Sequence, residues 1–157
     1  MSRSENVILT NMCLIEDGQG NIVMQIRDSD RYDWSGAVLT GGHIENFESL
    51  YASVVREVYE ETGLTIFHPR LVGMKHFHLR KTGQRYLVFL YKVTEYQGKL
   101  RDSEEGKVVW ISRKDLEKGR IELAESMTET LQVFESKDIS ELFYERDESD
   151  DLQQYYF

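Results

Sequence analysis

Residues 42–64, GHIENFESLYASVVREVYEETGL, decide the fold of this chain. Residues 48–62 contain neither proline nor glycine, whereas Gly41 and Gly42 precede them and Gly63 follows them. Glycines on both sides of an uninterrupted segment are typical of a helix with a permissive start and a left-handed C-terminal stop. The sequence therefore predicts one helix over residues 48–62.

Three carboxylates lie together on one edge of this predicted helix. At about 100° per residue, Glu57, Glu60 and Glu61 fall within a turn and a half. Like charges at this spacing repel one another and weaken a helix. Solvation alone would tolerate them, but a divalent cation would turn the repulsion into a ligand set, because Mg²⁺ takes oxygen ligands and shares them with substrate phosphates.

The same stretch resembles the complete signature of the Nudix hydrolases. The fixed positions of that signature are matched by Gly42, Glu48, Arg56, Glu57, Glu60, Glu61 and Gly63. The resemblance implies an α/β fold, the Nudix-type α/β/α sandwich with a mixed β-sheet between helices, formed by residues 1–157 as a single domain. It also implies Mg²⁺- or Mn²⁺-dependent hydrolysis of a nucleoside diphosphate linked to another group.

The resemblance further implies roles for individual residues. Glu57, Glu60 and Glu61 would hold the metal together with the Gly41 carbonyl, and Arg56 would orient a neighbouring carboxylate through a charge-assisted hydrogen bond. The general base stays open among the carboxylates of this site.

A second acidic segment lies ahead of Trp110. Glu105-Gly106 resembles a pair found before the corresponding strand in MutT-type members, where the carboxylate reaches the metal as ligand or base. The alternatives are a solvated acidic loop, or Glu104 in the role of Glu105.

The remaining sequence alternates between strands and helices. The apolar residues 6–15 indicate a buried strand. Residues 21–27 alternate between apolar and mixed positions, so the sequence predicts that they form its hairpin partner. Residues 85–96 are apolar on both sides, as in a central strand covered above and below. Further elements are predicted as follows: a polar loop at 28–35, a short strand at 36–44, an extended stretch at 64–78, strands at 107–111 and 140–144, and helices at 113–118 and 121–135.

Candidate substrate-binding residues lie outside the helix. Arg27 ends a predicted strand and resembles an arginine that many Nudix proteins place near phosphates, although a surface ion pair explains it equally well. His76 and His78 are two apart and share one face of a strand; without a third ligand nearby they favour a polar face near substrate over a zinc site. Thr40 stands where the family usually has proline.

Composition limits the partners. A net charge of −9 argues against a nucleic-acid polymer or an anionic membrane and leaves a small-molecule nucleotide as the expected substrate. The single cysteine, Cys13, fits a core position and a reducing compartment, and the chain lacks an apolar signal core, so we expect a cytoplasmic protein. Residues 155–157 are either exposed, docked on the domain or part of a homodimer contact.

The preferred substrate is a nucleoside triphosphate, including oxidised purine forms, cleaved to monophosphate and pyrophosphate. ADP-ribose or a dinucleoside polyphosphate is the alternative substrate, and a nucleotide-binding regulatory module is the non-enzymatic alternative. The complete acidic set favours an enzyme. Candidate walls for a base are Phe77, Tyr86, Met127 and Leu131.

Overall fold

The computed structural model describes residues 3–27, 30 and 35–157, so most of the predicted polar loop at 28–35 lies outside the described residues. Its elements, in chain order, are β1 (Val7–Ile15), β2 (Asn21–Arg27), β3 (Gly36–Val38), α1 (Leu50–Thr62), β4 (Thr65–Phe67), β5 (Arg70–His78), β6 (Arg85–Val93), β7 (Glu95–Gln97), β8 (Lys107–Ser112), α2 (Arg113–Glu117), α3 (Met127–Glu135), β9 (Glu141–Arg146) and β10 (Leu152–Tyr156). None of the helices in the described part of the chain has the length and apolar character needed to cross a membrane.

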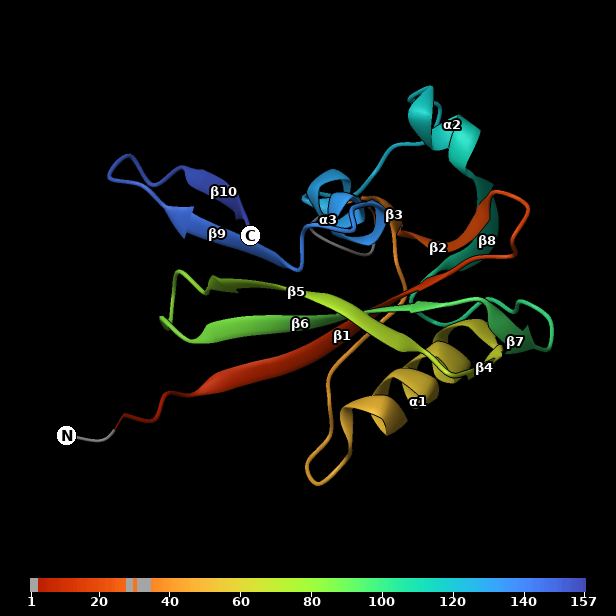
Figure 1. Cartoon of the computed structure of the whole chain (residues 1–157), viewed down its shortest axis with the longest axis horizontal. Helices are drawn as coiled ribbons and strands as arrows, with labels where there is room; N and C mark the ends of the chain where they lie inside the picture. Colours follow the sequence, from red (N-terminus) through yellow and green to blue (C-terminus); the bar gives the residue numbers. More distant parts are fainter. Residues whose placement is uncertain (1–2, 28–29, 31–34) are drawn as a thin grey trace.

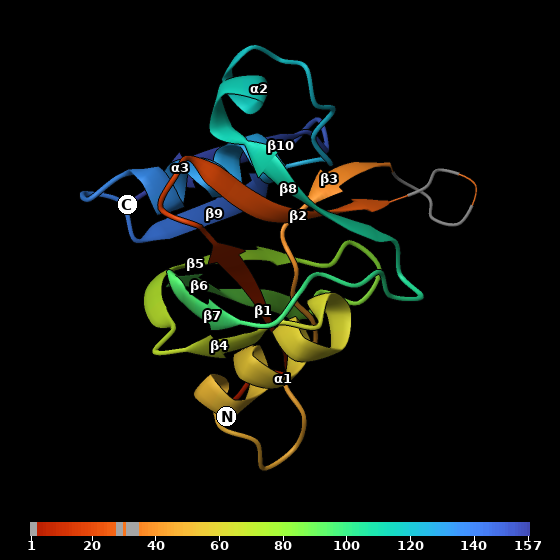
Figure 2. The ribbon, with the colours of Figure 1, turned by 90° about the vertical axis from the view of Figure 1, so that its right-hand side faces the viewer.

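The described strands form three sheets, of which the largest is mixed and is flanked by helices. The largest sheet has the order β1-β6-β5-β9-β10, a second antiparallel sheet has the order β3-β2-β8, and β4 pairs with β7. Helix α1 lies on one side of the five-stranded sheet, and α3 lies on the other side together with the three-stranded sheet (Figures 1 and 2). This arrangement confirms the predicted α/β/α sandwich. The predicted central strand is β6, which runs between a parallel β1 and an antiparallel β5.

Helix α1 forms as its glycine boundaries predict, with one additional cap. The Ser49 side chain accepts a hydrogen bond from the Ala52 N–H, so the helix begins at Leu50 rather than at residue 48. Gly63 closes the helix in the left-handed conformation, with φ of 78°. The buried face packs Val54 against β1.

The predicted hairpin between residues 6–15 and 21–27 is wrong. Strand β1 pairs with β6 on one edge, while Thr40 and His43 bridge to its other edge. Because both edges of β1 are occupied, β2 turns away after Glu16, with one bridge between Glu16 and Ile22, and joins β3 and β8 in the second sheet.

The predicted helix at 121–135 is wrong over its first six residues. The Ala37 N–H donates to the Glu122 carbonyl at 2.8 Å, and the Ala124 N–H donates to the Ala37 carbonyl at 3.0 Å. These bonds hold the segment extended beside β3, and Ser126, with φ of 64°, turns the chain into α3. The sequence left the placement of the C-terminal residues open. Tyr155 and Tyr156 belong to strand β10, which pairs with β9.

One charged residue lies in the main core. Lys75 on β5 is 5% exposed and stands opposite Val88 on one neighbouring strand and Leu142 on the other, both buried. Its ammonium group donates a hydrogen bond to the Ser126 hydroxyl at 2.5 Å. Burial lowers the pKa of Lys75 to about 8, and the negative charges of nearby Glu129 and Glu125 only partly oppose this.

We expect Lys75→Met to raise the free energy of unfolding at pH 7 by up to about 3 kcal/mol, since a shift from 10.5 to about 8 corresponds to about 1.4 kcal/mol per pH unit. The folded-state pKa lies below the unfolded one, so the unfolded chain binds more protons between pH 8 and 10.5 and wild-type stability rises across that window. Urea denaturation of both proteins from pH 7 to 10 should show their difference narrowing above pH 8. If the difference in the free energy of unfolding stays constant, the buried charge of Lys75 does not destabilise the protein.

Candidate functional site

The segment before helix α1 lies along the open edge of β1. The Asn11 N–H donates to the Gly42 carbonyl at 2.9 Å, and the Cys13 N–H donates to the Thr40 carbonyl at 2.8 Å. Thr40 is therefore compatible with the extended backbone expected at the usual proline position. Because the hydrogen-bonding direction alternates along an extended chain, the N–H and carbonyl of Gly41 point away from β1.

Two carboxylates of α1 meet this glycine backbone. The Gly41 N–H donates to the Glu61 Oε2 at 2.8 Å. A Cβ on Gly42 would lie 2.5 Å from the carboxyl carbon of Glu57, and a Cβ on Gly41 would lie 2.0 Å from the Asn11 carbonyl oxygen. Only glycine permits the strand, the helix and their carboxylates to approach so closely.

Arg56 fixes the acidic side chains around it. Its Nε donates to Glu48 at 2.7 Å, and its Nη1 donates to Glu57 at 2.8 Å and to Glu60 at 3.1 Å. Its Nη2 donates to the His43 carbonyl at 3.1 Å, which links the helix to the preceding segment. The guanidinium lowers the pKa of Glu48 to about 2.

A tight loop before β8 presents Glu105. Ser103 and Gly106 bridge across this loop, and the Glu105 N–H donates to the Ser103 hydroxyl at 3.2 Å. A Cβ on Gly106 would lie 2.5 Å from the Ile26 carbonyl oxygen, so the loop packs directly on β2. Consequently Arg27, at the end of β2, lies 3.8 Å from the Glu105 carboxylate.

The carboxylate of Glu105 in this loop lies close enough to Glu57 and Glu61 on the helix to raise the pKa of both. Burial, followed by a shared hydrogen bond with Glu105 and repulsion from Glu105 and Glu57, raises the pKa of Glu61 far above its ordinary value. Glu61 is 5% exposed. Burial also raises the pKa of Glu57; Arg56 opposes this increase, while the charges of Glu60 and Glu105 add to it. Negative groups from two separate elements therefore converge beside the Gly41 backbone.

The chemistry of this donor set fits a hard divalent cation. As the side chains stand, no three His, Cys, Asp or Glu residues in the described part of the chain surround a common point at which an ion would be held. Oxygens of Glu57 and Glu60 accept hydrogen bonds from Arg56 instead, and an oxygen of Glu61 accepts one from the Gly41 N–H. The residues are nevertheless oxygen donors whose mutual repulsion a cation would relieve, so they fit Mg²⁺ or Mn²⁺.

The two predicted histidines are not brought into this cluster. His76 bonds to Arg85 through Nδ1 at 2.9 Å and to Glu141 through Nε2 at 2.7 Å. His78 shares its face of β5, because side chains two apart in a strand point to the same side. Phe77, between them, points to the opposite face.

On that opposite face, Phe77 and Tyr86 form a stacked aromatic pair. Their ring centroids are 5.2 Å apart, and His43 lies edge-on to Tyr86 at 6.4 Å. His43 immediately follows Gly42, so the aromatic pair adjoins the segment that contacts the carboxylates. Neither ring is fully buried.

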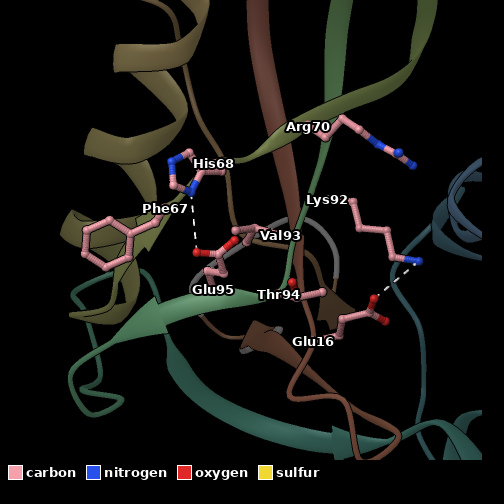
Figure 3. Close-up of a pocket in the computed structure, with 8 residues that line it drawn as sticks. All are labelled: Glu16, Phe67, His68, Arg70, Lys92, Val93, Thr94 and Glu95. Carbon is pink, nitrogen blue, oxygen red and sulfur yellow. Dashed lines mark hydrogen bonds and ion pairs between the residues drawn. The ribbon is translucent and has the colours of Figure 1, made fainter.

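A separate pocket of about 350 Å³ contains none of the predicted site residues (Figure 3). Its lining consists of Glu16, Phe67, His68, Arg70, Lys92, Val93, Thr94 and Glu95. Lys92 pairs with Glu16 at 3.4 Å and His68 with Glu95 at 3.4 Å, as the dashed lines show. Lys92 and His68 therefore already face carboxylates, and the acidic cluster remains the candidate site.

Two supporting residues were missed by sequence reasoning. Asn11 is buried, donates to the Ser53 hydroxyl at 2.8 Å and accepts from the Gly42 N–H at 3.4 Å. Gln25, 1% exposed, accepts from Arg27 at 3.2 Å. The signal that could have identified both is a polar residue inside an otherwise apolar strand, since buried polar groups require partners.

The fold and this acidic site together define a protein class. The NUDIX domain family model matches residues 9–134, and the chain therefore belongs to the Nudix family. It is 34% identical over 84 residues to the uncharacterized Nudix hydrolase YvcI of Bacillus subtilis, an alignment covering 51% of this chain and 53% of that protein. The chain thus spans about half the length of that relative.

Solved structures show the same fold. The mutator MutT protein of Bacillus halodurans superimposes with a TM-score of 0.77 at 22% identity, over 95% of this chain and 97% of that one. The ORF135 protein of E. coli gives a TM-score of 0.69 at 25% identity, over 86% of this chain and 93% of that one. These neighbours show that the fold is shared.

Glu61→Gln should raise the free energy of unfolding in excess chelator by more than about 1 kcal/mol, the equivalent of one pKa unit of relieved unfavourable interaction. The amide keeps an oxygen that accepts from Gly41 and gains an N–H that can donate to Glu105. Denaturant unfolding measures the change. The matched control is Glu60→Gln, which weakens the bond to Arg56 and should leave stability equal or lower. A loss of stability in Glu61→Gln would show that the repulsion is already compensated.

Proposed function

We propose that this chain is a metal-dependent pyrophosphohydrolase that cleaves a nucleoside triphosphate to nucleoside monophosphate and pyrophosphate. The observation that supports it is the convergence of three carboxylates whose charges oppose one another beside Gly41: the buried Glu61, the partly buried Glu57 and the exposed Glu105. An ordinary solvated acidic surface does not account for a carboxylate that is buried beside two others. Residues 1–157 are proposed to act as one domain.

In this proposal Glu57, Glu60, Glu61, Glu105 and the Gly41 carbonyl hold Mg²⁺ or Mn²⁺. Nudix hydrolases generally use such ions. A bound divalent ion would supply positive charge to the phosphate oxygens and polarise the attacking water.

The side chains of the site perform the remaining steps. Arg27 binds a phosphate oxygen of the substrate, a role that fits its place beside Glu105. Water forms a new bond to phosphorus while the anhydride bond breaks, and pyrophosphate leaves with the electron pair of that bond. A carboxylate of the acidic cluster takes the proton of the water. Arg56 keeps Glu57 in position.

The aromatic pair supports a nucleoside as the substrate group. Phe77 and Tyr86 offer partly exposed rings next to His43, and a base gains binding energy by stacking on such faces. Met127 and Leu131, the other predicted walls, pack in the core cluster of the same sheet face. One aromatic platform suits one base, which favours a triphosphate over ADP-ribose with its second ribose.

The function is tested with a substrate panel in Mg²⁺, Mn²⁺ or excess chelator, scored by phosphate, pyrophosphate and nucleotide products. We expect pyrophosphate release from a triphosphate with a higher kcat/KM than for ADP-ribose or a dinucleoside polyphosphate, and none in chelator. A higher kcat/KM for ADP-ribose would overturn the substrate assignment. Equal turnover in chelator would overturn the metal assignment, and nucleotide binding without turnover would identify a regulatory module.

Glu105→Gln should reduce kcat by on the order of 10²-fold, as expected when a metal-binding or proton-accepting carboxylate is lost. Glu104→Gln, the same change in the adjacent residue, is the matched control and should retain most activity. Adjacent loop residues point in different directions, and Glu105 is the one whose charge acts on Glu61. Greater loss in the Glu104 variant would show that the neighbouring carboxylate has this role.

A further inference from the structure

A polar cluster of Lys75, Ser126 and Tyr144 lies inside the core between β5, β9 and the start of α3. The Lys75 ammonium donates to the Ser126 hydroxyl at 2.5 Å and lies 5.7 Å from the centre of the Tyr144 ring. Lys75 is 5% exposed and Tyr144 is 7% exposed. Figure 1 shows α3 above β5, and the hydrogen bond from Lys75 places Ser126, the residue before α3, over that strand.

The hydrogen-bonding capacity of this cluster is not filled. The Tyr144 hydroxyl is buried, and no described residue stands in hydrogen-bond geometry to it. An ammonium group offers three donors, and Ser126 accepts one of them. Buried polar groups without partners destabilise the folded protein. A ligand that supplies the missing acceptor would relieve this cost.

The cluster adjoins the aromatic pair on the same face of the sheet. Strand register places Phe77 opposite Tyr86, and the pairing of His76 with Phe143 places Tyr144 beside Phe77. Lys75 points to the same face as Phe77, because the two residues are two apart in the strand. A base stacked on the rings would therefore have its outer edge next to the Lys75 cluster.

The charges around the cluster define what it can bind. Glu125 and Glu129 are close enough to raise the pKa of Lys75, so a further anion would be repelled. A neutral oxygen acceptor would receive hydrogen bonds from the ammonium and from the Tyr144 hydroxyl without that repulsion. An amino group in the same place would set its N–H donors against the Lys75 ammonium, which has no acceptor, and would leave the ammonium without the added hydrogen bond.

We propose that the Lys75 cluster binds the keto oxygen of the substrate base and makes the enzyme selective for keto bases over amino bases. This inference rests on the proposed function, since it assumes that a base stacks on Phe77 and Tyr86. Guanine and uracil present a keto oxygen where adenine and cytosine present an amino group. Sites built to form a specific hydrogen bond reject analogues that lack the matching group.

The test compares GTP, UTP, ATP and CTP, which separates the keto or amino group from the size of the base. Wild type should prefer each keto base over the amino base of equal size by at least about tenfold in kcat/KM. Lys75→Met should bring both ratios close to one, mainly by raising KM for GTP and UTP. Tyr144→Phe, which removes only a hydroxyl, should reduce the ratios in the same direction. Lys92→Met, the same change in the separate pocket, is the matched control and should leave them unchanged.

A structural role for Lys75 would lower kcat/KM for all four substrates equally, and that result would overturn the proposal. Absence of a keto preference in wild type would also overturn it. Calorimetric binding of GMP and AMP to the same variants separates this inference from the proposed function. Preferential GMP binding that is lost in Lys75→Met, without turnover of any triphosphate, would retain the inference and overturn the hydrolase. Equal or absent binding of the two monophosphates together with no turnover would overturn both.

Discussion

The absence of side chains at Gly41 and Gly42 permits the contact on which the site depends. Helix α1 approaches the segment beside β1 so closely that a Cβ on Gly42 would enter the Glu57 carboxylate. The same approach gives Glu61 a hydrogen bond from the Gly41 N–H. Because the backbone of this segment is bonded to β1, the carboxylates of the helix take their positions from the main sheet. Arg56 then restricts Glu57 and Glu60 to one side of the helix.

The second sheet contributes two charged groups, Arg27 and Glu105, that helix α1 does not supply. Strand β2 runs antiparallel to β8, and their register pairs Ile26 with Lys107. The residues just beyond this pair are Arg27 on one strand and the tight loop with Glu105 on the other. A cation and an anion are thereby held beside the helix carboxylates by a backbone ladder rather than by flexible side chains. The division of the strands into two sheets, which the sequence did not predict, is thus the reason that both groups reach the site.

The sequence predicted local features well and pairing poorly. Glycine boundaries located α1, because the positions that stop a helix are set by the residues themselves. The hairpin prediction failed because the partner of β1 is β6, more than seventy residues later, and no local pattern reports a distant strand. The start of α3 was misplaced because Ala37, far away in sequence, bonds to Glu122 and keeps it extended. His76 was grouped with the site from spacing alone, although spacing gives a shared face and not which face.

Two buried charged side chains in the described part of the chain, Glu61 and Lys75, lower its stability, and our proposals place them at the two ends of one bound nucleotide. The Glu61 carboxylate lies close to other carboxylates, and a bound cation would relieve the repulsion between them. The Lys75 ammonium is buried in the core, and a further oxygen acceptor would stabilise its charge. In this reading, ligand binding and fold stability are linked at both ends, because a ligand that binds only the folded state stabilises it in proportion to its concentration over Kd.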